Sequence, residues 1–232
     1  MDLFSGFYVI DGGTCMERKK AAAKYHMQIV LICICIIFLA ACGKRQMEQI
    51  EFENLQVVQV DCERQKGSGV VYAASEGDMV VITAAHVLAE GNTATVIWKT
   101  EKNENGAELG TIYKVSGLDL AFLKIEGASV PYGPVREAKK NDESQVILRG
   151  YDGQGDMQET VGAVWEDWIY VEDFGCHMMV VKAETVPGMS GGGVFYTNGE
   201  FAGIICGADE EGNVAILPAS VILAEYEVIF GK

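Results

Sequence analysis

The sequence predicts an all-β protein folded as a sandwich or a barrel, and three observations carry this prediction. From about residue 51 onward the chain reads as short apolar runs rich in Val, Ile, Tyr and Phe. Turn sequences such as SEGD and NENG separate several of these runs, which is typical of consecutive short strands. Helical periodicity is scarce before the last segment of the chain.

The predicted strands fall into two sets separated by a linker. The first set covers residues 54–60, 67–74, 79–85, 93–98, 108–115 and 120–125. The second set covers residues 145–150, 158–165, 167–172, 177–184, 192–197, 200–207 and 213–217. Residues 127–142 contain two prolines and a charge cluster, which is typical of a linker. We also expect a short turn of helix after His86 and a closing helix over residues 218–230.

Composition allows a large core and excludes some partners. The chain has 232 residues, of which 49% are hydrophobic, so it can bury a core of ordinary size. It carries 33 acidic and 18 basic residues, a formal charge of −15. Phosphate backbones would repel so acidic a surface, so nucleic acid is not an expected partner.

Cysteine usage gives no sign of a disulfide framework or a metal centre. Four of the seven cysteines lie at or before residue 42, which leaves Cys62, Cys176 and Cys206 in the rest of the chain. Three cysteines allow at most one internal disulfide. Since no paired Cys/His spacing is present, we expect neither a metal nor another cofactor.

The N-terminal segment has the layout of a signal peptide over residues 1–42. A basic stretch precedes an apolar run from Ile29 to Ala41, which is shorter than the roughly 20 residues of a membrane span. The sequence LAAC resembles the lipobox of bacterial lipoproteins, which implies a lipid on Cys42 as the first residue of the mature protein. The folded domain would then be residues 43–232. We expect an exported protein anchored to a membrane on its extracytoplasmic side, with ordinary secretion as the alternative. The layout favours Met16 as the true start.

The sequence PGMSGGG, residues 187–193, is the strongest candidate for a catalytic loop. Glycines around Ser190 would let a substrate carbonyl approach its hydroxyl and would leave backbone N–H groups free to bind a developing oxyanion. Glycine-rich loops are also common without any catalytic role, because glycine tolerates most backbone angles. The other residues of the chain must therefore decide between these interpretations.

A serine nucleophile needs a base and an orienting carboxylate, and few residues qualify as the base. His86 follows an apolar strand and is favoured over His177, which lies inside a predicted strand where a packed or surface imidazole is expected. Asp119 stands at the start of a strongly apolar strand, although one Asp there can also be a turn residue. No histidine follows Ser190, which excludes the α/β-hydrolase order. The subtilisin order of Asp, His and Ser would need an α/β chain. The order His86, Asp119, Ser190 therefore remains.

These residues lie in segments that resemble trypsin-like serine peptidases of chymotrypsin fold, most closely the bacterial high-temperature-requirement protease domains. The segments are GSGVV, ITAAHVL, LDLAFLKI, PGMSGGGVFYTNGEFAGI and NVAILPAS, which together span Gly67 to Ser220. The resemblance implies two six-stranded antiparallel β-barrels with a short C-terminal helix. Barrel one would cover residues of about 50–126 and barrel two residues of about 143–232.

The resemblance also implies roles for individual residues. Ser190 would be the nucleophile, His86 the general base and Asp119 its orienting carboxylate, with the N–H groups of Gly188 and Ser190 forming the oxyanion hole. The substrate would be a peptide or protein, cleaved through an acyl-enzyme. Two alternatives remain: a catalytically inactive protease-like binding or scaffold lipoprotein, and an esterase acting on other acyl groups.

Substrate-binding residues are implied on both sides of the nucleophile. Glu184 and Thr185 correspond to the base of the specificity pocket, and Cys206 and Gly207 to the strand that pairs with the peptide. An inward carboxylate on Glu184 would favour a basic residue before the cut bond, whereas a loop of the bacterial type, which we favour here, would accept a small apolar residue. Cys206 can also be simply a small buried residue.

The chain departs from the family pattern at three places. Met189 replaces the aspartate that activates trypsin zymogens, so we expect no such activation. Gly193 replaces a frequent proline, with little expected consequence. The sequence ends at Lys232 without the PDZ modules of many relatives, so neither regulation by such modules nor an oligomeric state can be inferred.

Overall fold

The computed structural model describes residues 57–63, 65–75, 78–88, 92–99, 105–127 and 144–231. All of them belong to one compact unit, Phe52–Lys232, which is separate from Met1–Glu51. The predicted signal peptide, its start at Met16, the lipid site at Cys42 and residues 128–142 of the predicted linker lie outside the described residues. Within the described ranges, no helix is long and apolar enough to cross a bilayer.

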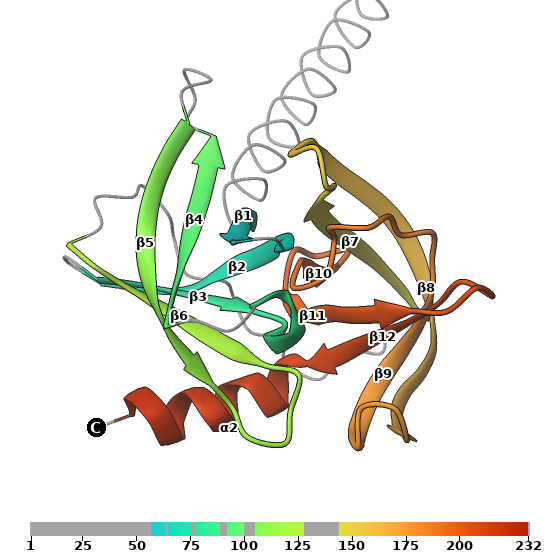
Figure 1. The fold of residues 1–232 in the computed structure, drawn as a ribbon. Helices are drawn as coiled ribbons and strands as arrows, with labels where there is room; N and C mark the ends of the chain where they lie inside the picture. Colours follow the sequence, from blue (N-terminus) through green and yellow to red (C-terminus); the bar gives the residue numbers. More distant parts are fainter. Residues whose placement is uncertain are drawn as a thin grey trace, which may run out of the picture. The chain divides into compact units, whose positions relative to one another are not determined.

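The described chain folds into two closed antiparallel barrels of six strands each, which confirms the predicted fold class (Figure 1). In barrel one the strands are ordered β1-β2-β3-β6-β5-β4, and in barrel two β10-β11-β12-β9-β8-β7. Barrel one comprises β1 (Val57–Cys62), β2 (Gln65–Ser75), β3 (Asp78–Thr83), β4 (Thr93–Lys99), β5 (Asn105–Lys114) and β6 (Ala121–Glu126). Barrel two comprises β7 (Gln145–Tyr151), β8 (Met157–Val171), β9 (Cys176–Lys182), β10 (Gly193–Tyr196), β11 (Phe201–Ala208) and β12 (Asn213–Pro218).

Strand β3 of barrel one is apolar at consecutive positions because both of its faces are buried. In β3, Met79 and Val81 point into the core of barrel one. Val80 and Ile82 alternate with them and belong to the cluster that also contains residues of barrel two. Side chains alternate across a strand, so the run MVVIT fits a strand packed between two cores.

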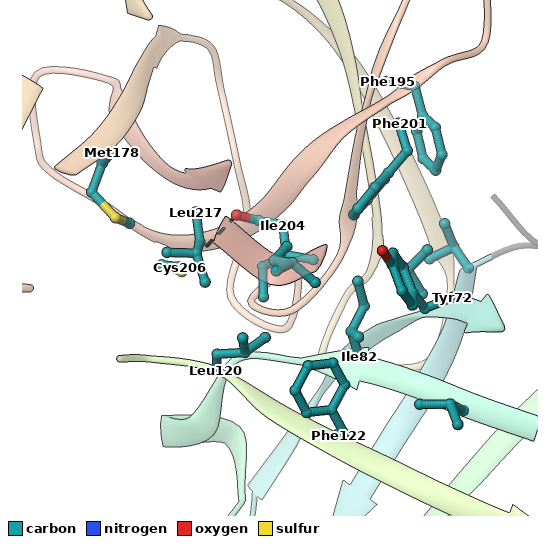
Figure 2. Packing of buried hydrophobic residues seen from close by; sticks show 14 of the residues in the cluster. Tyr72, Ile82, Leu120, Phe122, Met178, Phe195, Phe201, Ile204, Cys206 and Leu217 are labelled. Atoms are coloured by element: carbon teal, nitrogen blue, oxygen red, sulfur yellow. Dashed lines mark hydrogen bonds between the residues drawn. The ribbon is translucent and has the colours of Figure 1, made fainter. Parts of the chain in front are cut away.

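The interface between the barrels is an apolar cluster closed by α2 (Ala219–Phe230), the helix predicted at the end of the chain. Figure 2 shows Tyr72 and Phe122 of barrel one in the same cluster as Phe195 and Phe201 of barrel two. Tyr226 of α2 lies edge-on to both Tyr72 and Phe122, with ring centroids 5.0 and 6.0 Å apart. The last element of the chain therefore packs on the first barrel and holds the two barrels together.

One predicted boundary is wrong. Residues 158–165 and 167–172 were expected as two strands, but they form the single strand β8. Its register against β9 shifts between Val164 and Glu166 and again between Glu166 and Ile169. Such bulges break the two-residue alternation of side chains without ending the strand, which explains why the pattern suggested a turn there.

Candidate active site

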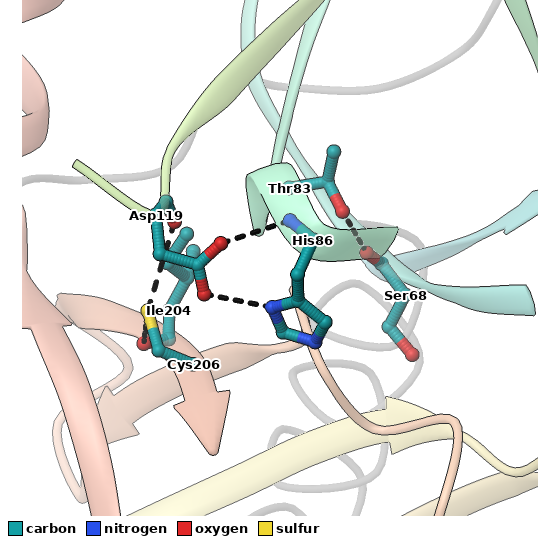
Figure 3. A network of polar contacts seen from close by, with 6 residues as sticks. All are labelled: Ser68, Thr83, His86, Asp119, Ile204 and Cys206. Carbon is teal, nitrogen blue, oxygen red and sulfur yellow. Dashed lines mark hydrogen bonds and ion pairs between the residues drawn. The ribbon is translucent and has the colours of Figure 1, made fainter. Parts of the chain in front are cut away.

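His86 and Asp119 come from two separate turns of barrel one and meet in space. His86 lies in the single-turn helix η1 (Ala85–Val87) directly after β3. Asp119 ends the turn between β5 and β6, where the next residue, Leu120, is fully buried and its carbonyl accepts a hydrogen bond from the Val115 amide. The Nδ1 atom of His86 lies 2.7 Å from Oδ2 of Asp119, and the His86 backbone N–H donates to Oδ1 at 2.9 Å (Figure 3).

This two-point contact fixes the orientation of the imidazole and keeps the Asp119 carboxylate charged. Burial by itself would raise the pKa of Asp119, but hydrogen bonds from the side chain and backbone of His86, with their charge attraction, hold it below its ordinary value. The Asp119 side chain is 16% exposed, whereas that of His86 is 50% exposed. The carboxylate therefore holds Nδ1–H, which leaves Nε2 of a half-exposed imidazole to act as a base.

Cys206 of β11 contacts the backbone of Asp119. Its thiol lies 3.8 Å from the backbone carbonyl oxygen of Asp119, and the residue is only 2% exposed. Burial, and then the neighbouring charge of Asp119, raise the pKa of the Cys206 thiol well above its ordinary value. The thiol therefore stays protonated and neutral beside the carboxylate, unlike a reactive cysteine.

Ser190 lies in the loop between β9 and β10, and hydrogen bonds hold every carbonyl from residue 187 to residue 190. The Pro187 oxygen accepts from the Gly153 amide at 3.1 Å, and the Met189 oxygen accepts from the Gly192 amide at 2.8 Å. The Gly188 oxygen accepts from the Ser68 hydroxyl at 2.8 Å. The Ser190 oxygen accepts from the Ser68 amide, also at 2.8 Å.

These bonds determine where the N–H groups of the loop point. The described peptide bonds are all trans, so each N–H points opposite to the carbonyl of the preceding residue. The N–H of Gly188 therefore points away from Gly153, and the N–H of Ser190 points away from Gly192. Gly188 has a φ of +104°, and a Cβ there would lie 2.6 Å from the carbonyl carbon of Asp152. Only glycine suits this position, because other residues rarely adopt this φ and their Cβ would collide with Asp152.

Ser68 and Thr83 are part of the site but were given no role by the sequence reasoning. Both are fully buried in barrel one, and the Thr83 hydroxyl donates to the Ser68 carbonyl at 2.7 Å. Gly191, with a φ of +82°, packs against them so closely that a Cβ would collide with the Ser68 carbonyl oxygen and the Thr83 hydroxyl. The segment GSGVV, which contains Ser68, stands out in the sequence only through the resemblance to trypsin-like peptidases.

A cavity of about 640 Å³ opens beside the loop that carries Ser190. Ser190 lines it together with Glu184, Thr185 and Gly207, three of the residues predicted to bind substrate. Asp209 and Glu210 add two further carboxylates, and none of the described residues lining this cavity is Lys or Arg. The cavity therefore has an anionic rim over an apolar floor.

A second cavity, of about 510 Å³, lies on the side of the base. His86, Asp119 and Cys206 line it together with Leu118 and Phe174, so Cys206 faces this cavity and not the first one. Phe174 comes from the turn between β8 and β9, which the sequence did not associate with the site. Its ring would lie 3.2 Å from a Cβ at Gly207, a residue that lines the first cavity.

The structure thus brings His86 and Asp119 into direct contact and places His177 elsewhere. Next to Ser190, Gly191 packs against Ala84, so that a Cβ there would lie 3.0 Å from the Ala84 nitrogen. Ala84 immediately precedes η1, the short helix that carries His86. His177 is an exposed residue of β9 whose ring stacks on Trp168, with centroids 5.2 Å apart. The role of the three residues as a triad stays a prediction at this point.

Two closed six-stranded antiparallel barrels are the architecture of the chymotrypsin fold, so the chain is a chymotrypsin-fold protein. The chain belongs to the trypsin-like peptidase domain family, whose model matches residues 67–204. No curated protein sequence matches the chain significantly.

Solved structures show the same fold. The active form of the Rv3671c protease from M. tuberculosis is 21% identical with a TM-score of 0.64, over 79% of this chain and 84% of that one. Deg5 is 22% identical with a TM-score of 0.64, over 82% and 96% of the two chains. The MamO protease domain from Magnetospirillum magneticum is 20% identical with a TM-score of 0.61, over 75% and 97%. At these identities the likeness concerns the fold alone.

Proposed function

We propose that the protein is a serine endopeptidase in which Ser190 is the nucleophile, His86 the general base and acid, and Asp119 the orienting carboxylate. The observation that carries the proposal is the two-point contact of His86 with Asp119, at 2.7 and 2.9 Å, in a chain of the trypsin-like peptidase family. The orientation of the Pro187–Gly188 peptide, held by Gly153, supports an active loop over an inactive binding protein.

The reaction uses each of these groups in turn. The Ser190 oxygen attacks the peptide carbonyl while its proton passes to Nε2 of His86, and Asp119 stabilises the resulting imidazolium. The N–H groups of Gly188 and Ser190 bind the oxyanion, and each such donor is typically worth about 10²–10³ in rate. The C–N bond then breaks, and the leaving amine takes the proton from His86. Water attacks the remaining ester by the same steps and releases the acid and the free serine.

The anionic cavity favours a basic side chain next to the cut bond over the small apolar one that the sequence favoured. Its three carboxylates, on Glu184, Asp209 and Glu210, give a local negative potential. The side-chain amide of Asn213, the backbone amides of Asn213 and Glu211 and the charge of Lys182 keep the pKa of Asp209 below its ordinary value, so this carboxylate remains charged. A Lys or Arg side chain complements this lining in both charge and length.

We further propose that the peptidase is exported and held at a membrane by a lipid on Cys42. The support is the signal-peptide layout of residues 1–42, which ends in the lipobox-like sequence LAAC. Mass spectrometry of the mature N-terminus from cells tests this proposal. A diacylated Cys42, absent from a Cys42→Ala variant, is expected, whereas an unmodified N-terminus elsewhere would contradict it.

The peptidase proposal is tested by labelling with a fluorophosphonate probe and by cleavage of a peptide library. The wild type should be labelled on Ser190 and should cut peptides, while Ser190→Ala should do neither. A protein that is folded but neither labelled nor active on peptides would support the binding or scaffold alternative. Labelling with hydrolysis of simple esters but not of any peptide would support the esterase.

A further inference from the structure

Ser68 is a buried residue of barrel one whose polar groups bind the nucleophile loop of barrel two. It is 0% exposed and lies in β2, 120 residues before Gly188 in the chain. Its hydroxyl donates to the Gly188 carbonyl at 2.8 Å and accepts from the Tyr151 amide at 2.7 Å. Its backbone N–H donates to the Ser190 carbonyl at 2.8 Å.

Each of these bonds restrains a different part of the loop. The hydroxyl of Ser68 fixes the Gly188–Met189 peptide. The backbone amide of Ser68 fixes the carbonyl of Ser190 itself. The Tyr151 amide, at the end of β7, donates to the hydroxyl oxygen. The single hydroxyl proton then goes to the nearer of two carbonyls, that of Gly188 at 2.8 Å and not that of Tyr151 at 3.4 Å. Thr83 in turn holds the Ser68 carbonyl at 2.7 Å and so restrains the backbone of Ser68 itself.

We infer that Ser68 is a positioning residue for catalysis: its hydroxyl holds the Gly188–Met189 peptide, which joins the two peptides whose N–H groups, those of Gly188 and Ser190, face the substrate. The inference rests on the proposed peptidase function. Ser68 does not touch the reacting atoms, so it acts on the rate through the orientation of the loop. An unpaired buried carbonyl is unfavourable, so without the hydroxyl the Gly188 peptide turns to seek another partner.

The variant Ser68→Ala removes the hydroxyl and keeps the amide that binds Ser190. We expect kcat per titrated active site to fall by roughly tenfold to a hundredfold, below the full loss of an oxyanion donor, with KM within about twofold. The control is Ile125→Val, a substitution in the core of barrel one away from the loop. This control should lower thermal stability and leave kcat per site unchanged, since counting sites with a fluorophosphonate removes the effect of unfolded protein.

Amide hydrogen exchange provides a readout that does not depend on activity. In Ser68→Ala the amides of Tyr151, Met189 and Gly192 should exchange at least about tenfold faster than in the wild type, and in Ile125→Val they should not. If Ser68→Ala does not fold, Ser68→Cys retains a weak donor and should give an intermediate loss of kcat.

The outcomes separate this inference from the proposed function. An active wild type with unchanged kcat per site in Ser68→Ala would overturn the inference and leave the peptidase proposal intact. An inactive wild type whose loop nevertheless exchanges faster in Ser68→Ala would overturn the peptidase proposal while supporting the restraint of the loop. Unchanged exchange in the loop would overturn the inference in either case.

Discussion

The bond from the Gly153 amide to the Pro187 carbonyl can be removed by the substitution Gly153→Pro, which replaces the donating N–H with a ring carbon. The Gly155 amide donates to the Asp152 carbonyl at 3.0 Å, so residues 152–155 form a β-turn with Gly153 at its second position. Proline is favoured there because its φ matches the turn. A Cβ at Gly153 would have no heavy atom within 4 Å, but the ring Cδ takes the place of the amide hydrogen and faces the Pro187 oxygen, which lies 3.1 Å from the nitrogen. The Pro187–Gly188 peptide must therefore turn away from residue 153. The Asp152 carboxylate also braces the turn through the amides of Gln154 and Asp156.

The expected loss follows from what the lost bond restrains. One neutral hydrogen bond is worth about 0.5–1.5 kcal/mol net, which corresponds to a population shift of roughly 2- to 12-fold away from the oriented Pro187–Gly188 peptide. If the peptide turns over completely, the Gly188 donor is lost and the rate falls by about 10²–10³. We therefore expect kcat to fall between roughly twofold and a few hundredfold, with KM nearly unchanged because binding in the cavities does not use this amide.

The assay is steady-state hydrolysis of a good peptide substrate, normalised by titration of active sites. Gly153→Ala is the matched control, because it adds a Cβ into open space but keeps the N–H, and it should retain wild-type kcat. Gly153→Pro should unfold at a somewhat lower temperature than the wild type, since the lost hydrogen bond and the displaced Pro187 carbonyl outweigh the restriction of the unfolded chain by proline. A folded Gly153→Pro enzyme with the kcat of Gly153→Ala would refute the reasoning.

Three further predictions concern charged residues of the site. Asp119→Asn should leave the barrels folded but lower kcat by about 10⁴-fold, as seen when serine peptidases lose this carboxylate, and a smaller loss than tenfold would argue against its role. Because the pKa of Asp119 is lowered in the folded protein, its pair with His86 should stabilise the fold above about pH 4, the unfolded carboxyl range, and this contribution should disappear as pH falls through the folded pKa. Thermal unfolding of wild type and Asp119→Asn from pH 6 to pH 2.5 checks this, because their difference should shrink only below about pH 4. Glu184→Gln should reduce kcat/KM about tenfold or more for peptides with Lys or Arg at the cut site but not for those with Ala, while Glu227→Gln on α2 should change neither; equal losses for both peptides would contradict the proposed specificity.

The sequence allowed an all-β sandwich or barrel to be predicted because its strands have both strong apolar runs and clear turns. The two six-stranded barrels were implied by the resemblance to trypsin-like peptidases. The base and the acid could be singled out because the described chain beyond residue 56 offers only His86 and His177 as imidazoles, and the apolar strand after Asp119 marks its position. The continuous strand β8 could not be predicted, since bulges mimic a turn in the alternation of side chains.

The contributions of Ser68 and Phe174 could not be predicted for a different reason. The partners of Ser68 are 83 and 120 residues away in the chain, and a buried serine has no local pattern that names such partners. Phe174 lies within the turn between β8 and β9, where an exposed residue is expected, yet it lines the cavity beside His86. Both roles arise from the packing of one barrel on the other, which no local pattern specifies.

Ser68 of barrel one binds the loop of barrel two that carries Ser190. This contact can form only when the two barrels have come together. A nascent chain whose second half has folded but not docked carries a loop whose Gly188 and Ser190 carbonyls have not met Ser68. In the proposed peptidase, the loop is therefore held in its oxyanion-binding shape only after the two barrels have docked.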